Sequence, residues 1–352
     1  MSYLDGWNET TAISSIKSAE VQSVSVVIAA YNEERYIRAC VESVLKADYP
    51  HDKLQLVVVD NGSTDKTHEI LSSISEDRLV VLQEPKGFKK EALEAGFSES
   101  TGSIILCTDS DCIVPEFWIR SMVSPFQTKA ANMVLGPVKI GKYRNIVERF
   151  QAFDMLAMMG VTAGGLKAER SYLANGANMA FTQKAYRIVG EIPRKDLASG
   201  DDVFLLHQFI SMDKFKVHFQ KDSDAVISTQ AVSGWNNLIK QRRRWASKAT
   251  AYVSSKDRFA SVFIFVLVAS IFLNLLLIPF TGGLSFFIAL FQLFIKGTID
   301  YAFLTQVNLF FKQKHLLRYF IPAFLVHAVY ILFAGVSGLI GRPYNWRGRR
   351  TT

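Results

Sequence analysis

The most restrictive feature of the chain is a stretch of 37 residues, between Arg258 and Lys296, that contains no charged residue. Its first part, Phe259–Ile278, has 20 residues. At about 1.5 Å per residue this is enough to cross a hydrocarbon core of roughly 30 Å. Buried helices of a soluble core are the alternative, but charge-free stretches of this length are rare in soluble folds. We therefore predict that the C-terminal part of the chain is embedded in a membrane.

Two further apolar stretches follow. Leu284–Phe311 carries Lys296 and Asp300, whose i, i+4 spacing allows them to pair on one face of a helix. Tyr319–Gly341 contains no charged residue.

Basic residues flank the last apolar stretch on both sides. They are Lys312, Lys314, Arg318, Arg342, Arg347, Arg349 and Arg350. The positive-inside rule places both groups in the cytoplasm, and three full crossings do not satisfy it. Either one of the last two apolar stretches is interfacial or re-entrant, or the tail departs from the rule, and both alternatives stay open.

Charge and cysteine content indicate where the rest of the chain works. The net charge is +8, and from Phe259 onward eight basic residues face one acid, which leaves +1 for residues 1–258. The excess charge therefore flanks membrane segments and does not form a nucleic-acid-binding surface. Three cysteines are too few for a disulfide framework or a four-ligand zinc site. Residues 1–22 are polar and lack the apolar core of a signal peptide, so we expect the soluble part to face a reducing cytoplasm.

The soluble part alternates between strand-like and helix-like segments. Strands are expected at Val24–Ala30, Leu54–Val59, Leu79–Leu82 and Ser103–Cys107, and helices at Glu33–Lys46, Thr64–Ile74 and Lys89–Glu99. Ser63 or Thr64 is the expected N-cap of the second helix. This order predicts an α/β fold with an open, doubly wound, mostly parallel sheet flanked by helices.

Polar residues gather where three of these strands end. Tyr31-Asn32-Glu33, Asp60-Asn61-Gly62-Ser63 and Asp109-Ser110-Asp111 each follow a strand, and in such sheets ligands bind at that edge. Each segment alone is also typical of a turn. No glycine-rich phosphate loop is present, which argues against a dinucleotide dehydrogenase and a P-loop enzyme. The two carboxylates of Asp109 and Asp111 suit Mg²⁺ or Mn²⁺, and such a cation can hold a diphosphate.

Six motifs in order resemble a known family. They are VSVVIAAYNEE, VVVDNGSTD, DSD, NGANMAFT, GDDVFLL and QRRRW. The chain resembles a family-2 inverting glycosyltransferase of the GT-A fold with C-terminal transmembrane or interfacial helices. The resemblance covers roughly residues 22–260, and the tail sequence NWRGR is similar to that of many bacterial members.

The resemblance implies roles for individual residues. A nucleotide-sugar site is implied at Ala30, Tyr31, Glu33, Asp60, Lys89 and Asp109, with Asp60 on the base. Asp109 and Asp111 would bind the metal. Asp202 matches the general base, although the usual Glu-Asp pair is here Asp201-Asp202. Taken without the other motifs, a pair of acids that begins a helix would be the preferred interpretation of these two residues, and with the motifs both are expected at the catalytic site.

The QRRRW segment predicts a second group of binding residues. On a helix, Gln241, Arg244 and Trp245 project within one turn. Arg243 or Arg244 would pair with the diphosphate, and Trp245 would stack on a sugar ring of the acceptor. A basic amphipathic helix resting on the membrane is the alternative. The two are compatible if Arg242 and Lys248 face lipid phosphates.

The predicted organisation has five parts. They are a polar segment (1–22), the GT-A domain (23–233), an amphipathic interface helix with QRRRW (234–258), membrane helices (259–341) and a basic tail (342–352). Within the domain, residues 143–166 are an acceptor groove, a bilayer contact or a core helix.

The expected activity is that of a hexosyltransferase in the cytoplasmic (inner) membrane, with its catalytic domain in the cytoplasm. Its expected partners are a nucleotide-diphospho-sugar, a lipid-linked or glycan acceptor and the lipid bilayer. A processive polysaccharide synthase, a non-catalytic membrane scaffold and a transporter subunit are the alternatives.

Overall fold

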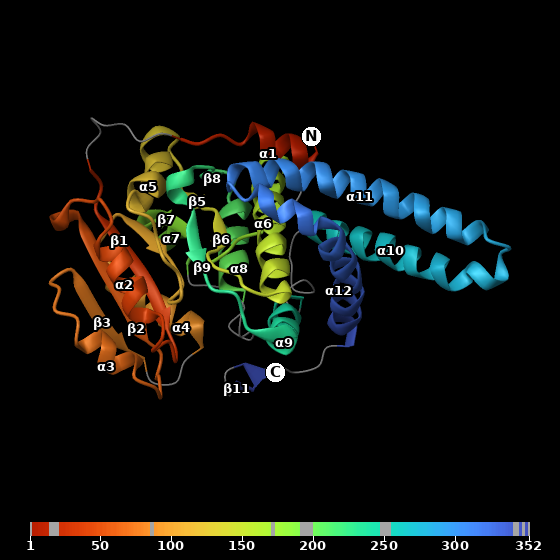
Figure 1. Cartoon of the computed structure of the whole chain (residues 1–352). Coiled ribbons are helices and arrows are strands. Elements are labelled where there is room, and N and C mark those ends of the chain that lie inside the picture. The colour runs from red at the N-terminus through yellow and green to blue at the C-terminus, as the bar shows by residue number, and fades with distance from the viewer. Residues whose placement is uncertain are drawn as a thin grey trace. The chain divides into compact units, whose positions relative to one another are not determined.

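The computed structural model describes residues 2–13, 21–84, 88–169, 173–190, 200–246, 255–340, 345–346 and 349–350 (Figure 1). These residues form two compact units. The sheet unit comprises Glu9–Lys142 and Tyr172–Gln230, and the helical unit comprises Met1–Asn8, Tyr143–Ser171 and Ala231–Thr352.

A seven-stranded sheet forms the centre of the sheet unit. Its strands are β1 (Val24–Ala30), β2 (Leu54–Asp60), β3 (Leu79–Gln83), β4 (Ile104–Cys107), β5 (Met133–Leu135), β7 (Met179–Thr182) and β8 (Val217–Phe219). They lie in the order β3-β2-β1-β4-β7-β5-β8. Only β7 pairs antiparallel with its neighbours, β4 and β5. The predicted mostly parallel α/β sheet is therefore confirmed.

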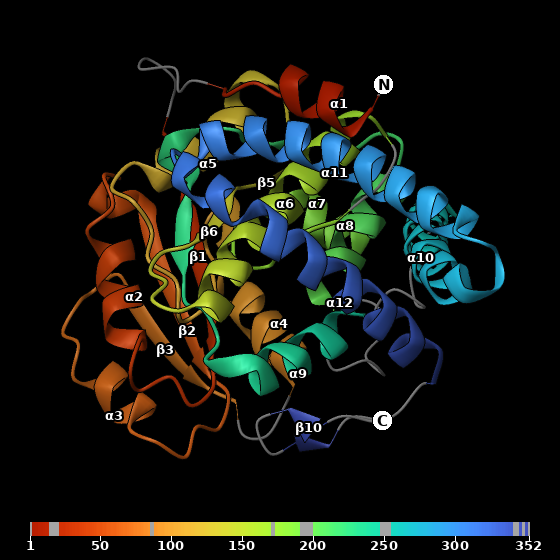
Figure 2. The same ribbon diagram turned by 45° about the vertical axis from the view of Figure 1, so that its right-hand side comes forward.

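Helices flank this sheet (Figure 2). They are α2 (Ile37–Leu45), α3 (Thr67–Ser72), α4 (Lys89–Glu99), α5 (Trp118–Thr128), α7 (Gln183–Val189) and α8 (Asp201–Ser211), with 3-10 turns η1 (His51–Lys53) and η2 (Ser223–Ala225). A short parallel pair joins β6 (Val138–Ile140) to β9 (Ile227–Thr229). Helix α4 packs closely on β1 and β2, because a Cβ atom at Gly96 would lie 2.5 Å from a methyl carbon of Val27.

The predicted start of the second helix is wrong by three residues. Helix α3 begins at Thr67, whose backbone N–H donates to Asp65 Oδ1 at 3.0 Å. Ser63 and Thr64 do not cap it, because they bond instead to the loop after β1. The N–H of Asn32 donates to Ser63 Oγ at 3.0 Å, and the N–H of Thr64 donates to Asn32 Oδ1 at 2.8 Å.

The helical unit contains the apolar C-terminal segments. Its elements are α1 (Tyr3–Glu9), α6 (Ile146–Lys167), α9 (Gly234–Ala246), α10 (Ser255–Leu277), η4 (Ile278–Phe280), α11 (Leu284–Phe310), η5 (Lys314–Tyr319), α12 (Phe320–Ile340), β10 (Asn345–Trp346) and β11 (Arg349–Arg350). By length and composition, three segments could cross a membrane: Val262–Phe280, Leu284–Phe310 and Lys314–Phe333.

Helix α6 is a core helix of the helical unit, the third of the three interpretations for residues 143–166. Asn145 caps it by accepting a hydrogen bond from the N–H of Glu148 at 3.0 Å. Gly160 lies against Val307 and Phe303 of α11, where a Cβ atom would come within 2.7 Å of both side chains. The predicted boundaries placed these residues in the 23–233 domain, whereas α6 groups with the C-terminal helices.

Candidate active site

The candidate site of the sheet unit begins where β1 and β2 end side by side. Ala30 pairs with Asp60 at the ends of the two strands, and the N–H of Asn61 donates to the carbonyl of Ala30 at 2.8 Å. The loops that follow are bonded together, since the N–H of Glu33 donates to Thr67 Oγ1 at 2.8 Å. Asn32 adopts a left-handed backbone conformation with φ of 55°. The loop carrying Tyr31 and Glu33 is therefore fixed against the loop after β2.

Asp60 is buried within these loops. The N–H of Ser63 donates to its Oδ1 at 3.1 Å, and His68 Nδ1 lies 3.5 Å from its Oδ2. The side chain of Asp60 is 3% exposed and that of His68 is 43% exposed. The Oδ2 side of Asp60 is therefore covered by the partly exposed His68 side chain.

The two carboxylates of the DSD triplet follow the end of β4. The ammonium of Lys89, at the first position of α4, forms an ion pair with Asp109. The hydroxyl of Thr229 in β9 donates to Asp111 Oδ2 at 3.2 Å. Cys112 is buried, and burial followed by the charge of Asp111 raises the pKa of its thiol well above the usual value.

Electrostatics links these acids to one another. Burial, followed by the charges of Asp109 and Glu33, raises the pKa of Asp111 to about 6. Three carboxylates at one sheet edge repel each other, and their oxygens are the ligands that Mg²⁺ and Mn²⁺ prefer. The residues present therefore fit a hard divalent cation. Burial disfavours the charge on Lys89, but Asp109, Asp201 and Asp202 together raise its pKa.

The Asp201-Asp202 pair occupies the first turn of α8. Asp202 Oδ2 accepts a hydrogen bond from the N–H of Gly176 at 3.1 Å, and its Oδ1 accepts from the N–H of Val203 at 2.9 Å. The NGANMAFT and GDDVFLL motifs therefore meet at this carboxylate. Asp201 Oδ1 lies 4.0 Å from the ammonium of Lys90, which is 1% exposed.

These contacts separate the two acids by environment. Asp201 lies beside a buried cation, which suits a structural role. Asp202 is oriented by two backbone donors, which suits a carboxylate that must present a fixed oxygen.

The QRRRW motif lies on α9, in the helical unit. Gln241, Arg243, Arg244 and Trp245 are all partly exposed. Arg242 is 3% exposed, so the expectation that it faces lipid phosphates is wrong. Its Nη2 instead lies 2.5 Å from Asp154 Oδ2 of α6. Lys248 lies outside the described residues.

Arg242 also contacts Trp245, one turn further along α9. Its guanidinium carbon lies 4.1 Å from the centre of the indole ring. The ion pair with Asp154 therefore holds α9 to α6. The guanidinium of Arg242 also covers part of the Trp245 ring on which a sugar was expected to stack.

Removing Asp154 should destabilise the protein strongly. Asp154→Ala leaves the Arg242 charge buried without its carboxylate, and we expect the free energy of unfolding to fall by about 3–5 kcal/mol. The double variant Asp154→Leu with Arg242→Met should recover most of that loss. Thermal or denaturant unfolding of the detergent-solubilised protein measures this. Lys240→Ala is the control, because Lys240 is exposed on α9, the helix that carries Arg242. An Asp154→Ala protein as stable as this control would contradict the anchoring role.

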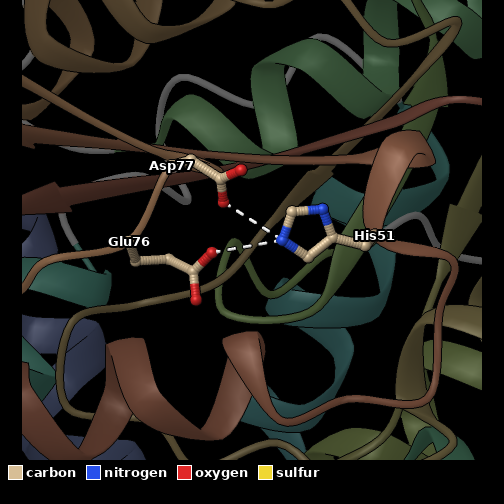
Figure 3. A group of neighbouring side chains, drawn as sticks. All are labelled: His51, Glu76 and Asp77. Atoms are coloured by element: carbon tan, nitrogen blue, oxygen red, sulfur yellow. Dashed lines mark ion pairs between the residues drawn. The ribbon is translucent and has the colours of Figure 1, made fainter.

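A separate group of potential ligands lies at the opposite edge of the sheet. His51 Nε2 is 3.6 Å from Glu76 Oε1 and 3.1 Å from Asp77 Oδ1 (Figure 3). His51 begins the turn η1 that precedes β2, and the two acids precede β3, whereas the DSD triplet follows β4. Arg78 donates to both oxygens of Glu76 and lowers its pKa to about 2. We interpret this group as a surface ion-pair cluster.

Sequence reasoning missed four residues of these sites. They are His68, Lys90, Thr229 and Asp154. Lys90 carried a weak signal, since it follows Lys89 at the start of an expected helix. The other three reach their partners only when the chain is folded, and no local sequence pattern marks them.

Comparison with known proteins identifies the enzyme class. Residues 25–186 match the model of the family described as Glycosyl transferase family 2. The chain is 28% identical over 324 residues to the probable glycosyltransferase YdaM of Bacillus subtilis, which covers 89% of this chain and 73% of that protein. The chain is a glycosyltransferase. The predicted enzyme class is thereby confirmed.

Two further similarities differ in how much of the glycosyltransferase they cover. A poly-beta-1,6-N-acetyl-D-glucosamine synthase of Staphylococcus aureus is 27% identical over 145 residues, covering 40% of this chain and 34% of the synthase. A mannosyltransferase of Pyrobaculum calidifontis, solved with GDP-Man and Mn²⁺, superimposes with a TM-score of 0.60. It is 19% identical and covers 96% of this chain and 93% of its own. This likeness, with the observed sheet, confirms the GT-A-like fold.

Proposed function

We propose that the glycosyltransferase moves a sugar from a nucleotide-diphospho-sugar to a lipid-linked or glycan acceptor, with inversion and with a divalent cation. The observation that carries this proposal is the arrangement at the sheet edge. Glu33, Asp109 and Asp111 form an acidic group there. Lys89 forms an ion pair with Asp109 and also interacts electrostatically with the Asp201-Asp202 pair. The solved mannosyltransferase complex contains a nucleotide sugar and Mn²⁺, which supports the choice of donor and metal.

The donor side of the reaction is assigned to the β1, β2 and β4 loops. Ala30, Tyr31 and Glu33 would line the nucleotide, and Asp60 would accept a hydrogen bond from the base. Asp109 and Asp111 would hold Mg²⁺ or Mn²⁺, and Lys89 forms an ion pair with Asp109. A cation bound there supplies positive charge against the departing diphosphate.

The acceptor side is assigned to Asp202. In an inverting displacement the acceptor oxygen attacks the anomeric carbon while the bond to the nucleoside diphosphate breaks, and the acceptor must lose its proton. That proton passes to a carboxylate oxygen of Asp202. The N–H groups of Gly176 and Val203 fix the orientation of this carboxylate. Arg243 or Arg244 would pair with the diphosphate and Trp245 would stack on the acceptor sugar.

The reaction is proposed to occur at the cytoplasmic membrane, in the synthesis of a cell-envelope glycan. The apolar helices α10 and α11 support membrane association. The similarity to a polysaccharide synthase supports a role in glycan synthesis.

The role of Asp60 is tested by Asp60→Asn. The asparagine oxygen can still accept from the N–H of Ser63, so the loop should keep its structure. The Oδ2 acceptor is replaced by an amide donor, and the free energy of one hydrogen bond to a charged group, about 1.5–3 kcal/mol, is lost. Calorimetry should show nucleotide affinity about tenfold weaker or more, with a smaller change in turnover at saturating donor. An unchanged affinity would remove Asp60 from the binding site.

A further inference from the structure

The α10–α11 hairpin has the dimensions of a membrane crossing. Phe303 and Val307 of α11 lie against Gly160 of α6, and Phe310 stacks edge-on with Trp7 of α1 at 5.6 Å. Of residues 284–302 of α11, only Ser285 and Ala289 are buried. At about 1.5 Å per residue this segment is about 28 Å long, close to the hydrocarbon thickness of roughly 30 Å. The turn Thr281-Gly282-Gly283 would then lie on the far side of the bilayer.

Helix α12 contacts this hairpin near its base. Its Phe320 contacts Tyr301 edge-to-face, with ring centres 5.1 Å apart, and the ring centre of its Phe324 lies 4.9 Å from the ammonium of Lys296. Tyr301 and Lys296 both lie in the last third of the α11 crossing. Gly335 lies against Phe265, near the start of the α10 span. In Figure 1 α12 runs across the direction of α10 and α11, whereas in Figure 2 it diverges from α11 at a shallower angle. If the hairpin stands along the bilayer normal, α12 is inclined away from that normal.

The inner face of α12 is packed on charged groups. His327 Nε2 lies 3.8 Å from Asp154 Oδ1, and Asp154 in turn pairs with Arg242. Helix α12 also packs along α9, whose sequence GWNNLIKQRRRWA carries four basic residues. A full crossing would bring these charges into the hydrocarbon core, where ionised side chains are costly.

The outer face of α12 is an apolar stripe. Exposed side chains recur every three or four residues at Ile321, Leu325, Val329, Phe333 and Val336. A helix with one face on the protein and one apolar face free suits the boundary between headgroups and acyl chains. Basic residues precede α12 and follow it in the sequence, so the positive-inside rule is satisfied only if its two ends lie on the same side.

We infer that α12 lies in the cytoplasmic interface of the bilayer and does not cross it, although its length and composition would allow a crossing. The chain then crosses twice, through α10 and α11, and both basic groups face the cytoplasm. The occupant of the apolar stripe is the lipid of the cytoplasmic leaflet. This inference rests on the membrane association in the proposed function.

Thiol labelling from each side of the membrane tests the inference. Single-cysteine variants Thr281→Cys, Lys314→Cys and Thr352→Cys are treated with a membrane-impermeant maleimide in spheroplasts and in inverted vesicles. Cys40, Cys107 and Cys112 are buried and give little background. We expect Thr281→Cys to react only in spheroplasts and the other two only in inverted vesicles. Reaction of Thr352→Cys in spheroplasts would overturn the inference and leave the membrane association intact. Failure of Thr281→Cys to react in spheroplasts would overturn the crossing itself.

Depth measurements provide an independent readout. Spin labels at Ile321→Cys, Leu325→Cys and Val329→Cys should report the same shallow depth, while Phe294→Cys on α11 should report a deep position. A crossing α12 would instead place positions 321 and 329 about 12 Å apart in depth. That difference would overturn the interfacial placement.

Discussion

Asp202→Asn is expected to lower the transfer rate at saturating donor and acceptor by about 10²–10⁴-fold, the usual contribution of a general base. The amide has nearly the same shape but cannot take the acceptor proton. Its single oxygen can keep only one of the two hydrogen bonds from Gly176 and Val203. Donor affinity should therefore change little, while thermal stability falls slightly.

Asp201→Asn is the matched control for Asp202→Asn. Asp201 lies beside the buried Lys90, so its loss should reduce stability more than it reduces the chemical rate. Rates normalised to folded protein separate the two effects. If Asp201→Asn is inactive and Asp202→Asn is active, the base is assigned to the wrong carboxylate. If both variants keep full activity, the pair only begins α8 and the proposed mechanism fails.

Asp111→Ala is expected to abolish metal-dependent turnover while the protein stays folded. Asp111 is one of three acids at the sheet edge, where it accepts hydrogen bonds from the hydroxyl of Thr229 at 3.2 Å and from the thiol of Cys112 at 3.7 Å. Removing it takes away a partly buried carboxylate that Asp109 and Glu33 repel. Direct Mn²⁺ binding, followed by electron paramagnetic resonance, should weaken at least tenfold in parallel with activity.

Asp77→Asn distinguishes this site from the other carboxylate group. Asp77 belongs to the exposed cluster with His51 and Glu76 at the opposite sheet edge (Figure 3). This variant should retain Mn²⁺ affinity and turnover. Full activity of the wild-type protein in EDTA, or loss of Mn²⁺ binding in Asp77→Asn instead of Asp111→Ala, would contradict the metal assignment.

The strands and their polar ends were predictable because the signals are local. Val24–Ala30 is a β-branched run whose buried partners, β2 and β4, lie on either side of it. In a parallel sheet the ends of such strands meet at one edge. That rule alone placed Asp60 and Asp109 at the same edge of the sheet.

The remaining features depend on contacts distant in sequence. Ser63 bonds to Asn32 rather than capping α3, because the loop after β1 competes for its hydroxyl. Thr229 reaches Asp111 from a strand 118 residues later. Arg242 lies in a basic segment of the kind expected to rest on lipid. Only its ion pair with Asp154 of α6 shows that it is buried.

The most direct test of the account is the transfer of labelled sugar from a panel of nucleotide-diphospho-sugars. Membranes containing the wild-type enzyme are incubated with each donor and Mn²⁺, and label in the lipid and polymer fractions is counted. We predict transfer from at least one donor, abolished by EDTA and by Asp111→Ala, and reduced about 10²–10⁴-fold in Asp202→Asn. If, for every donor tested, the wild-type enzyme transfers sugar no faster than Asp202→Asn, the proposed mechanism is contradicted.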